Sequence, residues 1–222
     1  MPRTKISEDI ELIIENVGGR GGGKPPVGEG HGDNGGKRRP SEPTSPKRYY
    51  TGIAVAIVSI LMFFMALVSA YVIRKGSSSD WNSFRFPAIV WVNTAILLAS
   101  SLTMELARRR LAASELAAFR AWWSVTTILG LVFLIGQLVV WRQLVAQGVY
   151  MASNPASSFF YVFTGAHGLH IVGGVGALVF VSFRKFEHSK VSRFTAAEVT
   201  SYYWHFLDVL WIFLAALLYW GR

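Results

Sequence analysis

The sequence predicts an all-α integral membrane protein, a bundle of five transmembrane helices preceded by a flexible cytoplasmic N-terminal tail. Hydrophobic residues make up 52% of the 222 residues and charged residues only 16%, against about 25% charged in an ordinary soluble domain. Five apolar runs also follow one another, each long enough to cross ~30 Å of hydrocarbon at 1.5 Å per residue. The runs are continuous rather than alternating, which indicates helices and not the strands of a β-barrel.

The tail comprises residues 1–48 and differs in composition from the rest of the chain. It holds nine Lys/Arg, seven Asp/Glu and a glycine-rich tract at 18–36, and such a segment buries too little apolar area to fold by itself. Apolar residues at helical spacing predict a short helix at 7–17, either nascent or used for docking. A mitochondrial transit peptide is poor in acids and this tail is not, which favours a bacterial origin.

The membrane domain comprises residues 49–222, with spans expected at about 50–73, 88–107, 122–141, 158–183 and 199–220. The first span contains no charged residue, and the second ends just before three consecutive arginines. The third runs from a Trp pair to another Trp, the fourth is rich in glycine, and the fifth ends at Trp220. Seven Trp and four Tyr fall mostly near span ends, which predicts an interfacial aromatic belt: Trp81, Trp91, Trp122, Trp123, Trp141, Trp211 and Trp220, with Tyr49, Tyr50, Tyr71 and Tyr219.

Lys and Arg are distributed unequally between the two ends of the predicted spans. Thirteen flank the end shared with the N-terminus and five flank the other end, so the positive-inside rule places the N-terminus in the cytoplasm and the C-terminus outside a bacterial cell membrane. The net charge of +9 is thereby explained without nucleic acid. The cytoplasmic groups Arg108–Arg110 and Arg184–Lys185 are also candidates to bind anionic lipid headgroups.

Ionisable side chains at membrane depth are concentrated in the last two spans and form a candidate polar seam. His167 and His170 lie in the fourth span, and Glu198, His205 and Asp208 lie in the fifth. Helical spacing puts the latter three on one side of their helix. Depths counted along antiparallel helices predict two facing pairs, His167 with Asp208, and His170 with His205 or Glu198.

Three interpretations of the seam compete. One is a metal or haem site, although the sequence has no Glu-x-x-His pair for a di-iron bundle and no His-Glu-x-x-His. The second is a proton or substrate pathway of a stand-alone transporter, which usually shows repeats or broken helices. The third, which the residues favour, is polar contact between helices that approach closely at small residues: Gly165, Gly168, Gly173, Gly174, Gly176 and Ala177. The absence of cysteine excludes disulfides, thiolate metal sites and iron–sulfur clusters.

The last two spans also resemble a known family. FFYVFTGAHGLHIVGG followed by YYWHFLDVLWIFLAALLYW is similar to subunit III of the haem–copper terminal oxidases, the cytochrome c and quinol oxidases. The second span (WVNTAILLASSLTM) and the third (ILGLVFLIGQLVVW) resemble the same family. The resemblance covers Tyr49 to Arg222 in its five-helix bacterial form and leaves out the first 48 residues.

The resemblance implies a non-catalytic accessory subunit of a proton-pumping respiratory oxidase. Such a subunit packs beside subunit I and with subunit II, carries no redox centre, binds phospholipid, and supports proton uptake and oxygen access; haem and copper belong to its partners. The family motif adds Asn93, Trp204 and Trp211 to the packing residues and implies no catalytic or metal-binding residue in this chain. The tail would suit attachment to a larger respiratory supercomplex. The alternatives are a five-helix subunit associated with nitric oxide reductase and the stand-alone transporter.

Two positions depart from the family pattern. Ile60 stands where the family usually has an intramembrane Glu in the first of these helices, and Val140 stands where an acid often precedes the Trp of the third span. A proton-linked role of those acids therefore does not transfer to this chain.

Overall fold

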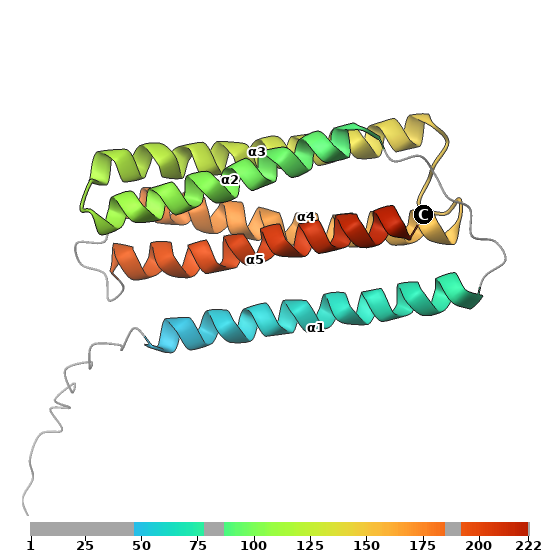
Figure 1. Ribbon diagram of the computed structural model, residues 1–222, viewed down its shortest axis with the longest axis horizontal. Coiled ribbons are helices and arrows are strands. Elements are labelled where there is room, and N and C mark those ends of the chain that lie inside the picture. Colours follow the sequence, from blue (N-terminus) through green and yellow to red (C-terminus); the bar gives the residue numbers. More distant parts are fainter. Residues whose placement is uncertain (1–46, 78–86, 185–191, 222) are drawn as a thin grey trace, which may run out of the picture. The chain divides into compact units, whose positions relative to one another are not determined.

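The computed structural model describes residues 47–77, 87–184 and 192–221 (Figure 1). Every secondary-structure element in these ranges is an α-helix, and all five helices are long and apolar enough to cross a membrane. The predicted fold class is confirmed. The tail and its expected helix at 7–17 lie outside the described residues, apart from Lys47 and Arg48.

The helices extend beyond most of the predicted spans. Their bounds are α1 Lys47–Ser77, α2 Ile89–Ala112, α3 Leu116–Ala146, α4 Pro155–Phe183 and α5 Arg193–Trp220. Apolar runs mark only the part of a helix that crosses hydrocarbon, whereas hydrogen bonding continues the helix into the headgroup region until a cap or a turn residue ends it. The extra turns therefore carry polar residues that a count of apolar residues leaves out.

Local sequence sets where α4 and α5 begin. The Asn154 side chain accepts a hydrogen bond from the Ser157 amide at 2.9 Å, and Ser157 Oγ accepts in return from the Asn154 amide at 3.3 Å. Pro155 occupies the first helical position, where its missing N–H costs nothing. Ser192 caps α5 by accepting from the Thr195 amide at 3.1 Å.

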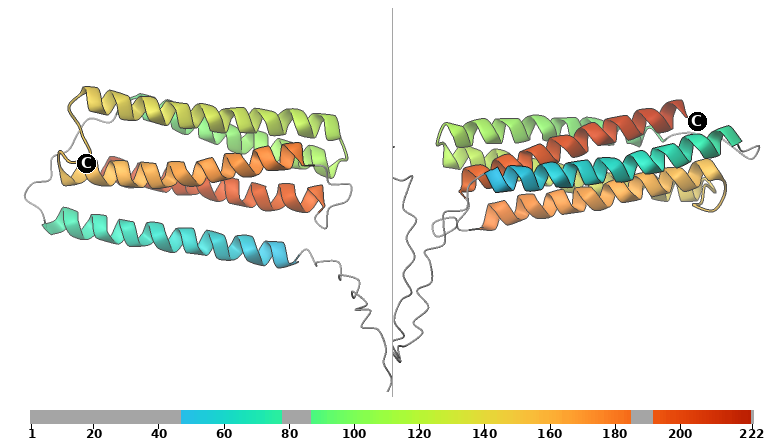
Figure 2. Two further views of the ribbon diagram at one scale, coloured as in Figure 1. Left: turned by 180° about the vertical axis from the view of Figure 1, so that it is seen from behind. Right: turned by 90° about the horizontal axis from the view of Figure 1, so that it is seen from below.

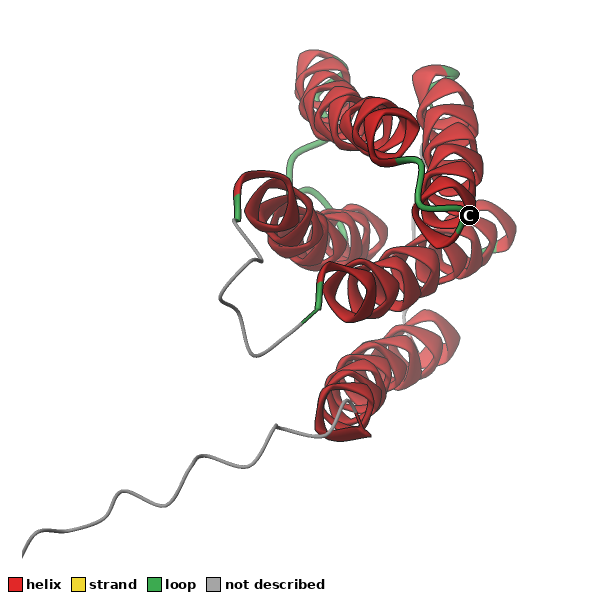
Figure 3. Cartoon of the chain, turned by 90° about the vertical axis from the view of Figure 1, so that its left-hand side faces the viewer, coloured by secondary structure: helices red, strands yellow, loops and turns green. Residues whose placement is uncertain are grey.

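Helices α2, α3, α4 and α5 form a four-helix bundle in which each helix packs against two neighbours, in the order α2, α3, α4, α5 and back to α2. The contact between α2 and α3 is the most extensive. Helix α1 packs against α4 and α5 from outside this bundle, as the view from below in Figure 2 and the end-on view in Figure 3 show. The core is built from large side chains of every helix, among them Phe64, Phe133, Phe163, Trp123 and Trp204.

Helix α1 is attached mainly through two aromatic side chains. Phe64 and Tyr71 are its only buried residues. The ring of Tyr71 packs edge to face on Phe159 at 5.4 Å and on Phe163 at 5.9 Å, centroid to centroid. Most of the remaining surface of α1 is apolar and exposed, so lipid or another membrane protein covers it in the bilayer.

Candidate functional site

His167 of α4 is fully buried in the bundle core. Its ring lies 5.1 Å from the Trp211 ring of α5 and 6.2 Å from the Phe133 ring of α3, measured between centroids. Phe133 and Trp211 pack edge to face at 5.1 Å. Among the residues that the structure describes, neither imidazole nitrogen has a hydrogen-bond partner. Aromatic packing therefore holds this imidazole in place.

Asp208 of α5 is buried, and its two carboxyl oxygens make no hydrogen bond to any described residue. Ser101 of α2 lies beside it, but Ser101 Oγ is engaged by His205 Nδ1 at 2.7 Å. The predicted hydrogen-bonded pair of His167 and Asp208 is therefore wrong.

The axial register of α4 and α5 explains this error. His167 lies level with Trp211, three residues beyond Asp208 along α5, which is an offset of about 4.5 Å. Trp204 contacts Gly174. Gly174 follows His167 by seven residues and Trp204 precedes Trp211 by seven, so the two contacts show the same axial alignment of the antiparallel helices. Depths counted from the ends of apolar runs carry an error of about one turn, because the runs do not mark where the helices begin.

His170 faces α1 rather than the polar residues of α5. Its Nδ1 lies 2.7 Å from the Ala166 carbonyl oxygen of its own helix, and its ring packs 5.6 Å from Phe64 and 6.5 Å from Phe63. The hydroxyl of Tyr203 donates to the His170 carbonyl oxygen at 3.3 Å. The predicted pairing of His170 with His205 or Glu198 is wrong. His205 points to α2, and Glu198 contacts α1 at Tyr50, about 20 Å along that helix from the Phe64 that His170 contacts.

Glu198 connects the beginning of α5 to the beginning of α1. Its Oε2 accepts a short hydrogen bond from the Tyr50 hydroxyl of α1, and its Oε1 accepts from Tyr202 at 3.2 Å. The rings of Tyr50 and Tyr202 are 6.4 Å apart. This contact joins two helices that are far apart in sequence. The sequence interpretation assigned Tyr50 to the interfacial belt and not to Glu198.

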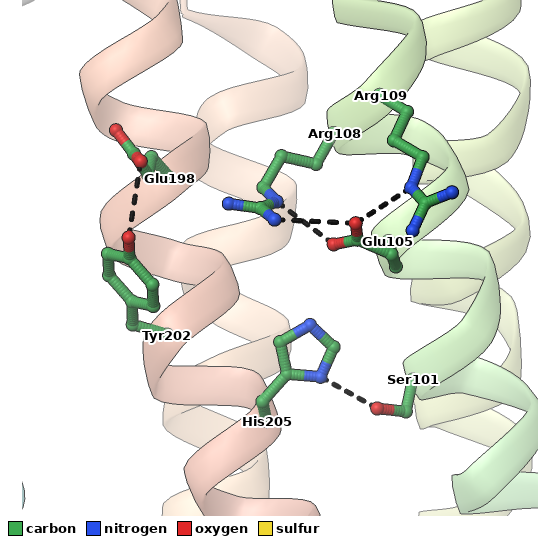
Figure 4. Close-up of polar contacts among 7 residues, drawn as sticks. All are labelled: Ser101, Glu105, Arg108, Arg109, Glu198, Tyr202 and His205. Carbon is green, nitrogen blue, oxygen red and sulfur yellow. Dashed lines mark hydrogen bonds and ion pairs between the residues drawn. The ribbon is translucent and has the colours of Figure 1, made fainter.

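Figure 4 shows the polar cluster between α2 and α5 in which His205 takes part. Glu105 of α2 accepts from Arg108 Nε at 3.0 Å and from Arg109 Nε at 2.8 Å. His205 lies below this ion pair, with Nδ1 directed at Ser101. Of the four arginines considered for headgroup binding, Arg108 and Arg109 are thus already paired within their own helix, and Arg110 pairs with Glu115 at 2.8 Å.

Tryptophan side chains make a series of hydrogen bonds across helices. Four indole Nε1 groups donate to a hydroxyl oxygen or a backbone carbonyl on another helix: Trp204 to Ser100 at 3.1 Å, Trp211 to Thr94 at 3.1 Å, Trp141 to Thr164 at 3.1 Å, and Trp123 to the Leu178 carbonyl at 2.9 Å. The indole N–H groups thus form hydrogen bonds between helices, while the apolar parts of the indole rings fill the core.

The predicted interfacial belt is correspondingly only partly right. Trp91 and Trp220 are exposed, as a belt requires, whereas Trp123 and Trp211 are buried and Trp141 is half-buried. Trp81 lies outside the described residues. The buried Trp could have been recognised from the Ser and Thr residues of the neighbouring predicted helices, whose hydroxyl oxygens can accept a hydrogen bond from an indole N–H at membrane depth.

Of the small α4 residues singled out, Gly174 is tightly packed, and Gly130 of α3, which was not among them, is packed more tightly still. A Cβ atom at Gly130 would lie 2.6 Å from the Trp204 ring, and one at Gly174 would lie 3.1 Å from it. At Gly165 and Gly173 the nearest atoms would be 3.8 Å away, and at Gly168 none would lie within 4 Å. The Trp204 ring therefore fits between α3 and α4 because two glycines leave it room.

Asn93 of α2 is buried against Gly136 of α3, and its Nδ2 donates to the Phe133 carbonyl oxygen at 3.2 Å. Its expected packing role agrees with this contact. Gln137, one turn from Phe133, is buried with no hydrogen-bond partner for its amide among the described residues.

The two positions that lack the family acids lie in apolar surroundings. Ile60 is half-buried and packs against the core, and Val140 is fully buried within it.

An apolar groove of about 230 Å³ lies between the cytoplasmic ends of α1, α4 and α5 as the sequence orients them. Ala177, Phe180 and Val199 line it, with Tyr49 and Arg184 supplying polar groups. The Arg184 guanidinium also lies 5.0 Å from the Phe180 ring centroid, a cation–π distance. Lys185 lies outside the described residues.

The polar side chains are therefore divided among separate helix contacts instead of converging on one point. Glu198 joins α5 to α1, His205 joins α5 to α2, and His167 is enclosed by rings. Within the described ranges, no three His, Asp or Glu side chains come together as a set of metal ligands. This arrangement is suited to holding helices together.

Comparison with known proteins agrees with this arrangement. Residues 44–222 match the family model described as cytochrome c oxidase subunit III. A probable cytochrome c oxidase subunit 3 of Nocardia farcinica is 36% identical, with 80% of this chain and 90% of that protein covered. The cytochrome c oxidase subunit 3 of Corynebacterium diphtheriae is 34% identical (78% and 88% covered), and that of Thermostichus vulcanus is 31% identical (76% and 85% covered). The match covers all five helices, and the chain belongs to the cytochrome c oxidase subunit III family.

Proposed function

We propose that this chain is a non-catalytic accessory subunit that stabilises a proton-pumping haem–copper oxidase in a bacterial cell membrane. Its main contact is with subunit I, with subunit II also in the complex, and the haem and copper are held by these partners. The observation that carries this proposal is the use of core polar groups in helix packing. Trp204, Trp211 and Trp141 bond to hydroxyl groups across helices, which leaves these groups committed to structure.

The groove beside Arg184 supports a lipid-binding role. Its walls are apolar enough for an acyl chain, and Arg184 and Tyr49 offer donors to a phosphate at the same end. The phospholipid is accordingly proposed between α1, α4 and α5.

Support for proton uptake and oxygen access comes from two different surfaces. Glu105 and Glu198 are half-buried ionisable groups near one end of α2 and of α5, where they can exchange protons with the cytoplasm under the predicted orientation. The exposed apolar surface of α1 is compatible with oxygen, which dissolves in the hydrocarbon of the bilayer. A role of the tail in a supercomplex stays a prediction.

Purification of the tagged chain in mild detergent tests the proposal. We expect it to co-purify with haem-bearing subunits, and we expect the oxidase lacking it to retain its haem spectrum while losing activity sooner during turnover. A stable, haem-free oligomer that moves a solute across liposomes would instead establish the transporter alternative.

A further inference from the structure

We infer that a transmembrane helix of a companion subunit, carrying hydrogen-bonding side chains, covers the face formed by α2 and α5 around the Ser101–His205 contact. This α2/α5 face consists of Ser101, Leu102 and Glu105 on α2 with Tyr202, His205 and Val209 on α5. The inference rests on the proposed function in one respect, because it requires that companion subunits are present.

The α2/α5 face is polar at its centre and only half covered by this chain. Ser101, Glu105 and His205 are half-buried, and Tyr202 is exposed. His205 uses Nδ1 to contact Ser101, and the described residues supply no hydrogen bond to its other ring nitrogen. The face therefore retains hydrogen-bonding capacity toward whatever covers it.

These polar groups reach into the membrane. Ser101 lies four residues from Glu105 along α2, which places it about 6 Å deeper than the ion pair shown in Figure 4. Acyl chains offer no hydrogen bonds at that depth, and ionisable groups there normally face protein or a water-filled cavity. Lipid alone would leave the His205 ring poorly solvated.

Other exposed faces of the described helices have a different character. The outward side of α1 carries Val58 and Met62, and that of α3 carries Ile128 and Ile135. Acyl chains cover such surfaces without loss of hydrogen bonds. The contrast singles out the α2/α5 face as the one whose chemistry calls for a polar protein partner.

The charges on this face favour a protein over a lipid headgroup. Glu105 is already paired with Arg108 and Arg109, at 3.0 Å and 2.8 Å, so this side presents no unpaired cationic cluster to a phosphate. Leu102 and Val209, 70% and 65% exposed, flank the polar centre. Apolar residues around a few polar ones are what interfaces between membrane helices use.

Site-specific photo-crosslinking in the intact, detergent-purified complex tests the inference. We would place p-benzoylphenylalanine at Leu102, with a matched control at Ile135, which is 61% exposed on α3. The expected product at Leu102 is an adduct that mass spectrometry maps to a transmembrane segment of a subunit of the same complex, whereas Ile135 gives mainly phospholipid adducts. Phospholipid adducts alone at Leu102 would overturn the inference.

Spin labels provide a second readout that does not depend on crosslinking yield. The chain contains no cysteine, so Leu102→Cys and Ile135→Cys each create a single labelling position. We expect collision with dissolved oxygen to be several-fold less frequent at position 102 than at position 135. Equal collision rates in a complex that contains companion subunits would reject the inference about the α2/α5 face and leave the proposed function standing. A preparation that contains no companion subunit would reject both.

Discussion

The indole Nε1 of Trp204 on α5 donates to Ser100 Oγ on α2 at 3.1 Å. The same ring contacts Gly130 of α3 and Gly174 of α4, so one side chain touches all three other helices of the four-helix bundle. Because a membrane offers no hydrophobic force between helices, their association depends on such close packing and on interhelical hydrogen bonds. Trp204 combines both at one position.

The contact of Trp204 with Gly130 predicts a strong effect of adding one methyl group. Gly130→Ala puts a carbon 2.6 Å from a fully buried, rigid ring, and overpacking of this kind costs about 1–3 kcal/mol. Gly168→Ala is the control, since no atom lies within 4 Å of its added Cβ. Unfolding of both variants in mixed micelles measures the difference, and equal stabilities would show that the bundle relaxes around Gly130.

The Trp204–Ser100 hydrogen bond predicts measurable coupling between the two side chains. Ser100→Ala leaves a buried indole N–H without its acceptor, and Trp204→Phe removes the donor. In membrane proteins such pairs contribute about 0.6 kcal/mol on average and about 1.7 kcal/mol at most. A double-mutant cycle on the free energy of unfolding measures this value, and additive effects would show that the bond contributes nothing.

The His205–Ser101 contact predicts a selective effect on assembly. His205→Leu removes the partner of Ser101 Oγ and the polar centre of the α2/α5 face, so we expect the chain to dissociate from the haem-bearing subunits sooner. His205→Gln keeps a hydrogen-bonding side chain, so more of this variant than of His205→Leu should stay bound to the haem-bearing subunits. The ratio of this chain to haem after prolonged detergent exposure is the measurement, and identical ratios for His205→Leu and the unmodified chain would argue against this role.

The distribution of Lys and Arg predicts the orientation of the helices. Alkaline phosphatase fused after Arg222 should be active, because that end is expected outside the cell, and the same enzyme inserted at Ser114 between α2 and α3 should be inactive. The opposite pattern would invert the topology.

Several features of the site were recognisable from the sequence. Apolar runs identified all five helices, because the length of such a run is set by the thickness of the bilayer. The motifs around His167 and Trp204 also identified the family. Tyr50 was not recognised as the partner of Glu198, because a tyrosine near a span end looks the same whether it faces a headgroup or another helix.

Sequence by itself determined the elements of this protein and which residues carry hydrogen-bonding groups into the membrane. Only the tertiary structure decided which of those residues meet. His167 faces Trp211 instead of Asp208, and His205 faces Ser101 instead of His170. The reason is physical: a shift of about one turn along a helix, or a rotation of about 100° around it, changes every neighbour. Those two quantities are fixed by how side chains such as Trp204 pack against glycines on other helices, which no single helix encodes.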